Sequence, residues 1–402
     1  MPGKMRKYMQ EIKFVTRKDG KGTRSGSCCS PESECTPNPV LTQSTCCTAE
    51  EKDLPLWARE NITTPSGMVM KVSTDWSLGD HWGMIRSRIS AYRMKYAVMP
   101  GLYTAGEPNK DSDVFVSANY KLSFDVLRRG LKGLNAWILV LDTKSINVWC
   151  AAGKGTFGTD ELVRRIAEVH LGTVVNHRRI IVPQLGAVGV SASAVQKRAG
   201  FHVYFGPVDA RDIAAYVQAG YKKTKEMSTI KFSMLDRLVL TPMEMNPITK
   251  KYLWFAAGIL LLFGLQPSGI LFEKAWAGGA PFLLLGLVSV LAGAFITPVL
   301  LPFVPCRSFA IKGWLVGMLS VLLAVQVFSL VDRHNMIMLA ATYLFFPAVS
   351  SYIALQFTGS TTFTGMSGVK KELKIGIPLY AITACISLLL MVLFKLREWG
   401  FV

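Results

Sequence analysis

Five long stretches without a charged residue lie in the second half of the chain and constrain its fold more than any other feature. They cover residues 252–272, 275–306, 313–331, 334–369 and 375–394. Each reaches the ~18–20 residues that an apolar helix needs to cross the hydrocarbon core of a bilayer. We therefore expect an all-α transmembrane domain over residues 252–402, with five helices near 252–272, 280–304, 310–330, 336–356 and 375–395.

The charges beside these stretches predict the orientation of the chain. Lys and Arg are retained on the cytoplasmic side of a membrane. Seven Lys or Arg residues flank the expected spans on the same side of the membrane as residue 250, and four flank them on the opposite side. The first 30 residues contain no apolar segment of signal-peptide length. We expect a multi-pass protein of the inner membrane, in contact with membrane lipid, with residues 1–250 in the cytoplasm.

Composition argues against several other classes of protein. Of the 402 residues, 50% are hydrophobic and 18% are charged, below the roughly 25% charged residues of ordinary soluble proteins. The net charge of +18 is spread along the chain, so we expect no nucleic-acid partner, because such partners are bound by concentrated basic patches. Ionisable residues are almost absent from the expected spans, which disfavours an ion or proton pathway.

Apolar runs of strand length alternate with helical patterns between residues 113 and 220. The expected strands are 114–118, 136–141, 180–182 and 202–205, and the expected helix N-caps are Ser123, Thr159, Ser191 and Asp209. This alternation predicts an α/β domain with a Rossmann-like parallel sheet covered on both faces. We expect this domain at residues 56–235, after a disordered tail at 1–55 and before a linker at 236–251.

Small and polar residues follow the expected strands. Ligands bind at the carboxyl ends of the strands in open α/β sheets. Asn119 follows the first strand, and Gln184 and Gly186 follow the third. We interpret these three as cofactor-binding residues, although ordinary strand-to-helix turns explain any one of them equally well.

Five of the eight cysteines lie in the N-terminal tail. The adjacent pairs Cys28-Cys29 and Cys46-Cys47 could capture a soft metal ion such as Hg(II) through thiolates. Cys35 completes the group, but the tail has no C-x-x-C repeat of the kind that holds zinc or an iron–sulfur cluster. A thiol-rich tail without a function fits the sequence equally well.

Cys150 lies in a segment that follows the second expected strand. The segment does not match a P-loop, and no spacing of His or Asn suggests a thiol hydrolase. The N–H groups at the start of a short helix favour a thiolate, and the small neighbours of Cys150 leave room for a large planar ligand. A buried structural cysteine is the alternative. The expected cofactor-binding residues here are Asn147, Val148, Trp149, Cys150, Ala151, Ala152, Gly153, Lys154 and Gly155.

This segment also resembles a known motif. Residues 147–154 are similar to the cap-helix signature of the corrinoid protein family of microbial mercury methylation, the HgcA family. Residues 116–125 and 182–187 resemble segments shared with the corrinoid iron–sulfur proteins of the acetyl-CoA pathway, and residues 362–369 are similar to that superfamily. The combination of a corrinoid domain with five membrane helices matches the architecture of the mercury family.

The resemblance implies a cofactor, a reaction and partners. Cys150 would be the catalytic lower axial ligand of a corrinoid cobalt, with the cofactor's own base displaced. The protein would be a corrinoid-dependent methyltransferase that receives a methyl group from a methyltetrahydrofolate-linked donor and passes it to Hg(II). A thiolate opposite the methyl group favours its transfer as a carbanion-like or radical species, which suits the electrophilic Hg(II). The implied reductant is a ferredoxin-like protein with two 4Fe–4S clusters.

The sequence departs from related patterns at two points. The Asp-x-His-x-x-Gly motif of another cobalamin-binding class is absent, and the tail cysteines do not reproduce the four-Cys cluster motif of the corrinoid iron–sulfur proteins. An external electron donor would therefore be needed. Two other functions remain open: a corrinoid methyl carrier of one-carbon metabolism with a different acceptor, and a membrane transporter or sensor with a cytoplasmic ligand-binding module.

Overall fold

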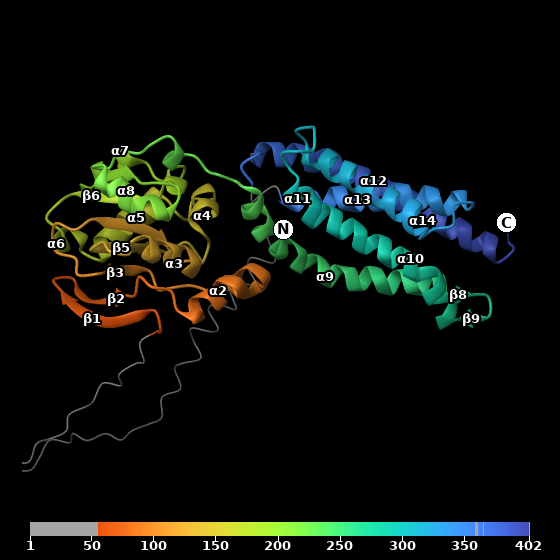
Figure 1. Cartoon of the computed structure of the whole chain (residues 1–402), viewed down its shortest axis with the longest axis horizontal. Coiled ribbons are helices and arrows are strands. Elements are labelled where there is room, and N and C mark those ends of the chain that lie inside the picture. The colour runs from red at the N-terminus through yellow and green to blue at the C-terminus, as the bar shows by residue number, and fades with distance from the viewer. Residues whose placement is uncertain (1–54, 358–360, 365, 402) are drawn as a thin grey trace, which may run out of the picture. The chain divides into compact units, whose positions relative to one another are not determined.

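The structure is a computed structural model that describes residues 55–357, 361–364 and 366–401 (Figure 1). The cysteines of the expected tail, from Cys28 to Cys47, lie outside the described residues. The described residues form an α/β domain followed by a helical part.

The α/β domain is built on a seven-stranded sheet with the order β1-β2-β3-β5-β4-β6-β7. The strands are β1 (Ala58–Thr64), β2 (Gly67–Val72), β3 (Gly101–Ala105), β4 (Val114–Ala118), β5 (Ala136–Leu141), β6 (Arg179–Val182) and β7 (His202–Phe205). The four expected strands are β4 to β7, and they are mutually parallel. The expectation of a wholly parallel sheet is wrong, because β1 pairs antiparallel with β2, and β3 pairs antiparallel with β5.

Helices cover both faces of the sheet. One face packs against α4 (Val148–Lys154), α5 (Thr159–Glu168), α6 (Leu171–Val174) and α7 (Ala192–Ala199). The other face packs against α3 (Lys121–Gly130) and α8 (Ile213–Gln218). Successive side chains of a strand point to opposite faces, so Leu139 contributes to the first core and Ile138 to the second. The α/β expectation is therefore confirmed, with layers on both faces.

The first residues of the observed helices can be compared with the expected N-caps. Ser191 caps α7, and Gly200 ends that helix in the left-handed conformation, with φ +74°. Ser123 is wrong as a cap, because α3 begins at Lys121 after Tyr120. Thr159 is the first residue of α5 rather than its cap, which is Gly158. Asp209 caps the 3-10 turn Ala210–Asp212 that leads into α8.

The helical part contains five long helices within the described residues. They are α9 (Met234–Gly264), α10 (Phe272–Leu291), α12 (Phe309–Phe328), α13 (Met336–Gln356) and α14 (Met366–Glu398), and α10 continues through a π-helical turn (Ala292–Ile296) into α11 (Thr297–Val299). They lie lengthwise beside one another (Figure 1). Buried apolar residues such as Phe263, Phe282 and Val321 join them in one core.

Four of these helical segments are long and apolar enough to cross a membrane: 272–299, 309–328, 336–356 and 368–398. The expected bounds of the first span, 252–272, are wrong, because α9 runs from Met234 to Gly264 and Leu265–Gln266 pairs with Gly269–Ile270 in a two-stranded hairpin. The first half of α9 also makes residues 236–251, expected as a linker, helical.

Candidate functional site

A cavity of about 300 Å³ lies beside the carboxyl ends of the parallel strands. In the order β5-β4-β6-β7 the chain leaves β4 toward β5 on one side and later returns to β6 on the other. The crevice between β4 and β6 is a topological switch point, where open α/β sheets bind their ligands. Its walls are mostly apolar and include Phe115, Leu127, Ile181 and Leu185.

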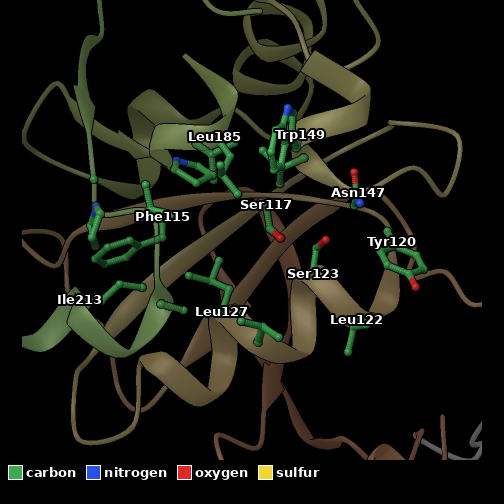
Figure 2. A pocket seen from close by; sticks show the side chains of 18 of the residues that line it. Phe115, Ser117, Tyr120, Leu122, Ser123, Leu127, Asn147, Trp149, Leu185 and Ile213 are labelled. Atoms are coloured by element: carbon green, nitrogen blue, oxygen red, sulfur yellow. The ribbon is translucent and has the colours of Figure 1, made fainter. Parts of the chain in front are cut away.

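Side chains from several elements converge on this cavity (Figure 2). Trp149 and Leu185 lie on one side of it, and Leu127 lies on the other. Ser117 and Ser123 supply hydroxyl groups along the walls. The cavity therefore combines an apolar interior with a few polar groups, which is the usual composition of a small-molecule site.

Helix α4 brings the expected cofactor residues to the rim of this cavity. Asn147 caps the helix, and its Oδ1 accepts a hydrogen bond from the Cys150 amide at 2.9 Å. Gly155 ends the helix with φ +79°, a conformation that favours glycine. Asn147, Val148 and Trp149 line the cavity, whereas Cys150 does not. Cys150, the residue after Trp149, is half-buried and is not in a disulfide.

The two faces of α4 have different roles. Ala151 and Ala152 are buried in the core beneath the helix, so they are not part of an open surface as expected. Gly153 and Lys154 are exposed, three and four residues after Cys150, and therefore share a helix face with it. A Cβ at Gly153 would meet no atom within 4 Å. The outer face of α4, formed by Trp149, Cys150, Gly153 and Lys154, is accordingly open beside the thiol.

Asn119 positions the loop that leads into α4. Its Oδ1 accepts hydrogen bonds from the Thr143 amide at 3.1 Å, the Thr143 hydroxyl at 2.9 Å and the Ser145 amide at 3.0 Å. Lys144 and Ser145 have φ near +60°, a strained conformation for these residue types. Asn119 is buried, and its side-chain oxygen accepts all three of these hydrogen bonds. In this structure Asn119 therefore holds the loop in place.

The loop after β6 contains the other two expected residues. Gln184 accepts a hydrogen bond from Lys223 through its side-chain oxygen. Gly186 is buried, and a Cβ there would lie 2.5 Å from Phe157 Cε1. At Gly189 a Cβ would lie 2.1 Å from the Phe157 carbonyl oxygen. These glycines let the β6 loop pack closely on the segment that ends α4, so Gly186 supports the site from behind.

Arg88 adds a cation to the wall of the cavity, and no motif in the sequence indicated this residue. It comes from α2 (Leu78–Ile89) and lines the cavity together with Ser123 and Trp149. Its Nε is buried without a hydrogen-bond partner. Burial lowers the pKa of the Arg88 guanidinium below its ordinary value. A half-buried cation with an unpaired Nε favours an anionic ligand group.

A buried ion cluster ties α2 to α3 beside the cavity. Arg128 Nη2 lies 2.7 Å from Asp80 Oδ1, and Arg128 Nε lies 2.7 Å from Asp125 Oδ1. Lys121 bridges the same two carboxylates. Burial alone would raise the pKa of Asp80, but hydrogen bonds from Arg128 and Ser77 outweigh it and lower the pKa to about 2. The spacing of Lys121, Asp125 and Arg128 suits one helix face, but their pairing with Asp80 has no sequence signal.

These residues fit a corrinoid in three respects. Cys150 supplies a free thiol on an open helix face, and soft thiolates are ligands for transition metals. Gly153 leaves space next to that thiol for a wide planar ring. The apolar cavity with Arg88 at its wall suits an aromatic base that carries a phosphate, and its volume is that of a ligand tail rather than of a whole corrin ring.

The fold defines an α/β domain with a mostly apolar cavity at the switch point between β4 and β6. A family model described as the delta subunit of CO dehydrogenase/acetyl-CoA synthase matches residues 84–217. This range contains the cavity and α4. The α/β part of the chain is therefore related to the corrinoid proteins of the acetyl-CoA pathway.

Individual relatives show the same relation. The gamma subunit of the acetyl-CoA decarbonylase/synthase complex of Archaeoglobus fulgidus is 28% identical over 131 residues, which cover 32% of this chain and 27% of that subunit. The large subunit of the corrinoid/iron–sulfur protein of Moorella thermoacetica is 28% identical over 116 residues, which cover 28% of this chain and 26% of the relative. The chain thus matches about a quarter of the length of these relatives.

Proposed function

We propose that this chain is a membrane-anchored corrinoid protein that carries a methyl group. One observation carries the proposal: Cys150 presents a free, half-buried thiol beside a cavity at the switch point, within the region similar to corrinoid proteins. When bound, the corrinoid would supply a cobalt ion that carries the methyl group. Cys150 would hold this cobalt through its sulfur.

Other residues would hold the cofactor around this thiol. The open position at Gly153 would admit the ring, and Trp149 would shield it from water on the cavity side. The cavity would hold the displaced nucleotide tail, with Arg88 facing its phosphate. Asn119 and Gly186 would act through the loops that fix α4, as positioning residues.

The similarity to subunits of larger complexes supports protein partners. We propose a ferredoxin-like reductant with two 4Fe–4S clusters and a methyltetrahydrofolate-linked methyl donor. Within the described part of the chain, no group of three or more His, Cys, Asp or Glu side chains could hold a metal ion. The α/β domain at 56–235 would face the cytoplasm, and the domain at 252–402 would lie in the inner membrane.

Hg(II) is the methyl acceptor that we propose. The matched relatives support a methyl carrier of one-carbon metabolism more directly than they support this acceptor. The resemblance of residues 147–154 to the cap-helix signature of the mercury-methylating family supports Hg(II), because a thiolate ligand on cobalt would favour methyl transfer to this electrophilic ion. The full chain with its reductant and methyl donor should form methylmercury from Hg(II). Methyl loading without methylmercury would leave a one-carbon carrier with another acceptor.

The cofactor and its ligand are tested together by spectroscopy. The full chain, purified in detergent from a corrinoid-producing host, should show corrinoid absorption bands. Cys150→Ala should shift these bands or lose the cofactor, and Cys150→His should shift them differently, because imidazole is a weaker donor than a thiolate. Cys385→Ala, which removes an exposed thiol from α14, is the matched control and should leave the bands unchanged. Identical spectra for the wild type and Cys150→Ala would reject Cys150 as the ligand.

A further inference from the structure

Helix α2 has its apolar face turned away from the domain that it packs on. The buried positions of this helix are Asp80, Gly83 and Ser87, all small or polar. The outward positions are Leu78, Trp82, Ile85 and Ile89, with exposed fractions of 89%, 64%, 42% and 51%. Their spacing of four, three and four residues places them on one narrow stripe of the helix. A surface helix ordinarily buries such a stripe.

The inward contacts fix this orientation. Asp80 belongs to the buried ion cluster with Lys121 and Arg128. Gly83 lies against Tyr96, because a Cβ there would be 2.3 Å from the Tyr96 hydroxyl oxygen. The Ser77 hydroxyl and the Asp80 carboxylate close a capping box at the helix start. Rotation of α2 to bury the stripe would break the ion cluster, so the apolar stripe stays outward.

Basic residues accompany the stripe. Between residues 77 and 99 the chain has four Lys or Arg residues and one acidic residue, the buried Asp80. Arg86 on α2 and Lys95 after it are exposed. Exposed Met94 and Met99 extend the apolar surface beyond the helix. An apolar stripe that contains Trp, bordered by positive charge, is the pattern of a helix that lies in the interface of a bilayer.

We propose that the α2 stripe, Leu78, Trp82, Ile85 and Ile89, docks the α/β domain on an anionic lipid surface. The same chain contains four helical segments long and apolar enough to cross a membrane, so a bilayer is tethered to this domain by covalent linkage. Arg86 and Lys95 match the negative charge of lipid headgroups. In a two-fold contact between copies, the same positive charges would face each other, which disfavours a second copy of the chain. This proposal does not depend on the proposed function.

Photo-crosslinking of the full chain tests the docking. The photoreactive amino acid p-benzoylphenylalanine replaces Trp82 in one variant, and it replaces Val188 in the control. Val188 is 85% exposed on the loop after β6 and is not part of the α2 stripe. Both variants are reconstituted into vesicles of phosphatidylcholine with phosphatidylglycerol, irradiated and analysed by mass spectrometry. We expect lipid adducts at position 82 and a several-fold lower yield at position 188.

The contribution of charge to docking is tested by comparing two variants that both carry the photoreactive residue at position 82, one with Arg86 and one with Arg86→Gln. In the variant labelled at position 82, Arg86→Gln should lower the ratio of docked to undocked domain about fivefold, because one basic residue near an anionic surface contributes ~1 kcal/mol. Vesicles of phosphatidylcholine alone should lower the adduct yield in the same direction. Equal lipid yields at positions 82 and 188, or crosslinks from position 82 to protein instead of lipid, would overturn the proposal. Corrinoid content of the samples has no bearing on either outcome.

Discussion

At the residue scale, the account depends on what surrounds Cys150. The thiol shares the outer face of α4 with Gly153 and Lys154, while Ala151 and Ala152 are buried under the helix. The sequence alone suggested that all the small residues cleared a surface for a planar ligand. The structure divides them, because Ala151 and Ala152 serve close packing in the core, Gly155 ends the helix, and Gly153 leaves open space beside the thiol.

This division predicts a selective effect at Gly153. Gly153→Leu should leave the fold intact, because a Cβ there meets no atom within 4 Å and Leu is a better helix former than Gly by roughly 1 kcal/mol. The leucine would cover the space beside Cys150, so bound corrinoid should fall about tenfold or more, in line with a steric cost above 1.4 kcal/mol. Cobalt content per chain and the melting temperature measure the two effects.

Lys197→Leu is the matched control for this variant. It adds an apolar side chain at an exposed position of α7, outside the outer face of α4. Cobalt content should fall much less in this control than in Gly153→Leu. Equal cobalt content in Gly153→Leu and the wild type would show that the ring does not lie over Gly153.

At the element scale, the sequence predicted the elements whose patterns are regular. Strands β4 to β7 were found because each is a short apolar run followed by a helix cap or a turn. Strands β1 and β2 form a hairpin outside that alternation. Helix α2 was not predicted from the sequence, because its apolar residues face outward and its inward contacts are ionic. The span at 252–272 was misjudged because a stretch without charge can also contain a hairpin.

The ion cluster between α2 and α3 should contribute strongly to stability. Arg128 is fully buried and pairs with both Asp80 and Asp125. Arg128→Met should therefore lower the free energy of unfolding of the α/β domain by about 3–5 kcal/mol, because it leaves buried carboxylates with one cation fewer. Denaturant unfolding of the full chain in detergent, followed by a probe in the α/β domain, measures this loss.

Arg129→Met serves as the control for that variant. Arg129 is the exposed neighbour of Arg128 on α3 and forms no ion pair among the described residues. Its guanidinium lies 5.0 Å from the Trp76 ring, a contact that contributes about 0.5–1 kcal/mol at an exposed site. Comparable losses in the two variants would contradict a special role for the cluster.

At the scale of the whole molecule, one chain combines a domain related to corrinoid proteins with helices of membrane-spanning length. The long apolar helices were largely predictable, because the thickness of a bilayer sets the length of an uncharged helix that could cross it. The site was predictable only in part. Cys150 and its helix stand out in the sequence, but Arg88 reaches the cavity from an element outside the recognised pattern. The tasks of Asn119 and Gly186 depend on contacts that only the fold creates.

The central claim is that the Cys150 sulfur binds a corrinoid cobalt. X-ray absorption at the cobalt edge, recorded on the full chain with its bound corrinoid, tests it most directly. The account predicts one sulfur atom in the first coordination shell of cobalt in the wild type and in Cys385→Ala, and none in Cys150→Ala. A cobalt shell of nitrogen and oxygen alone in the wild type, or a sulfur that persists in Cys150→Ala, would contradict it.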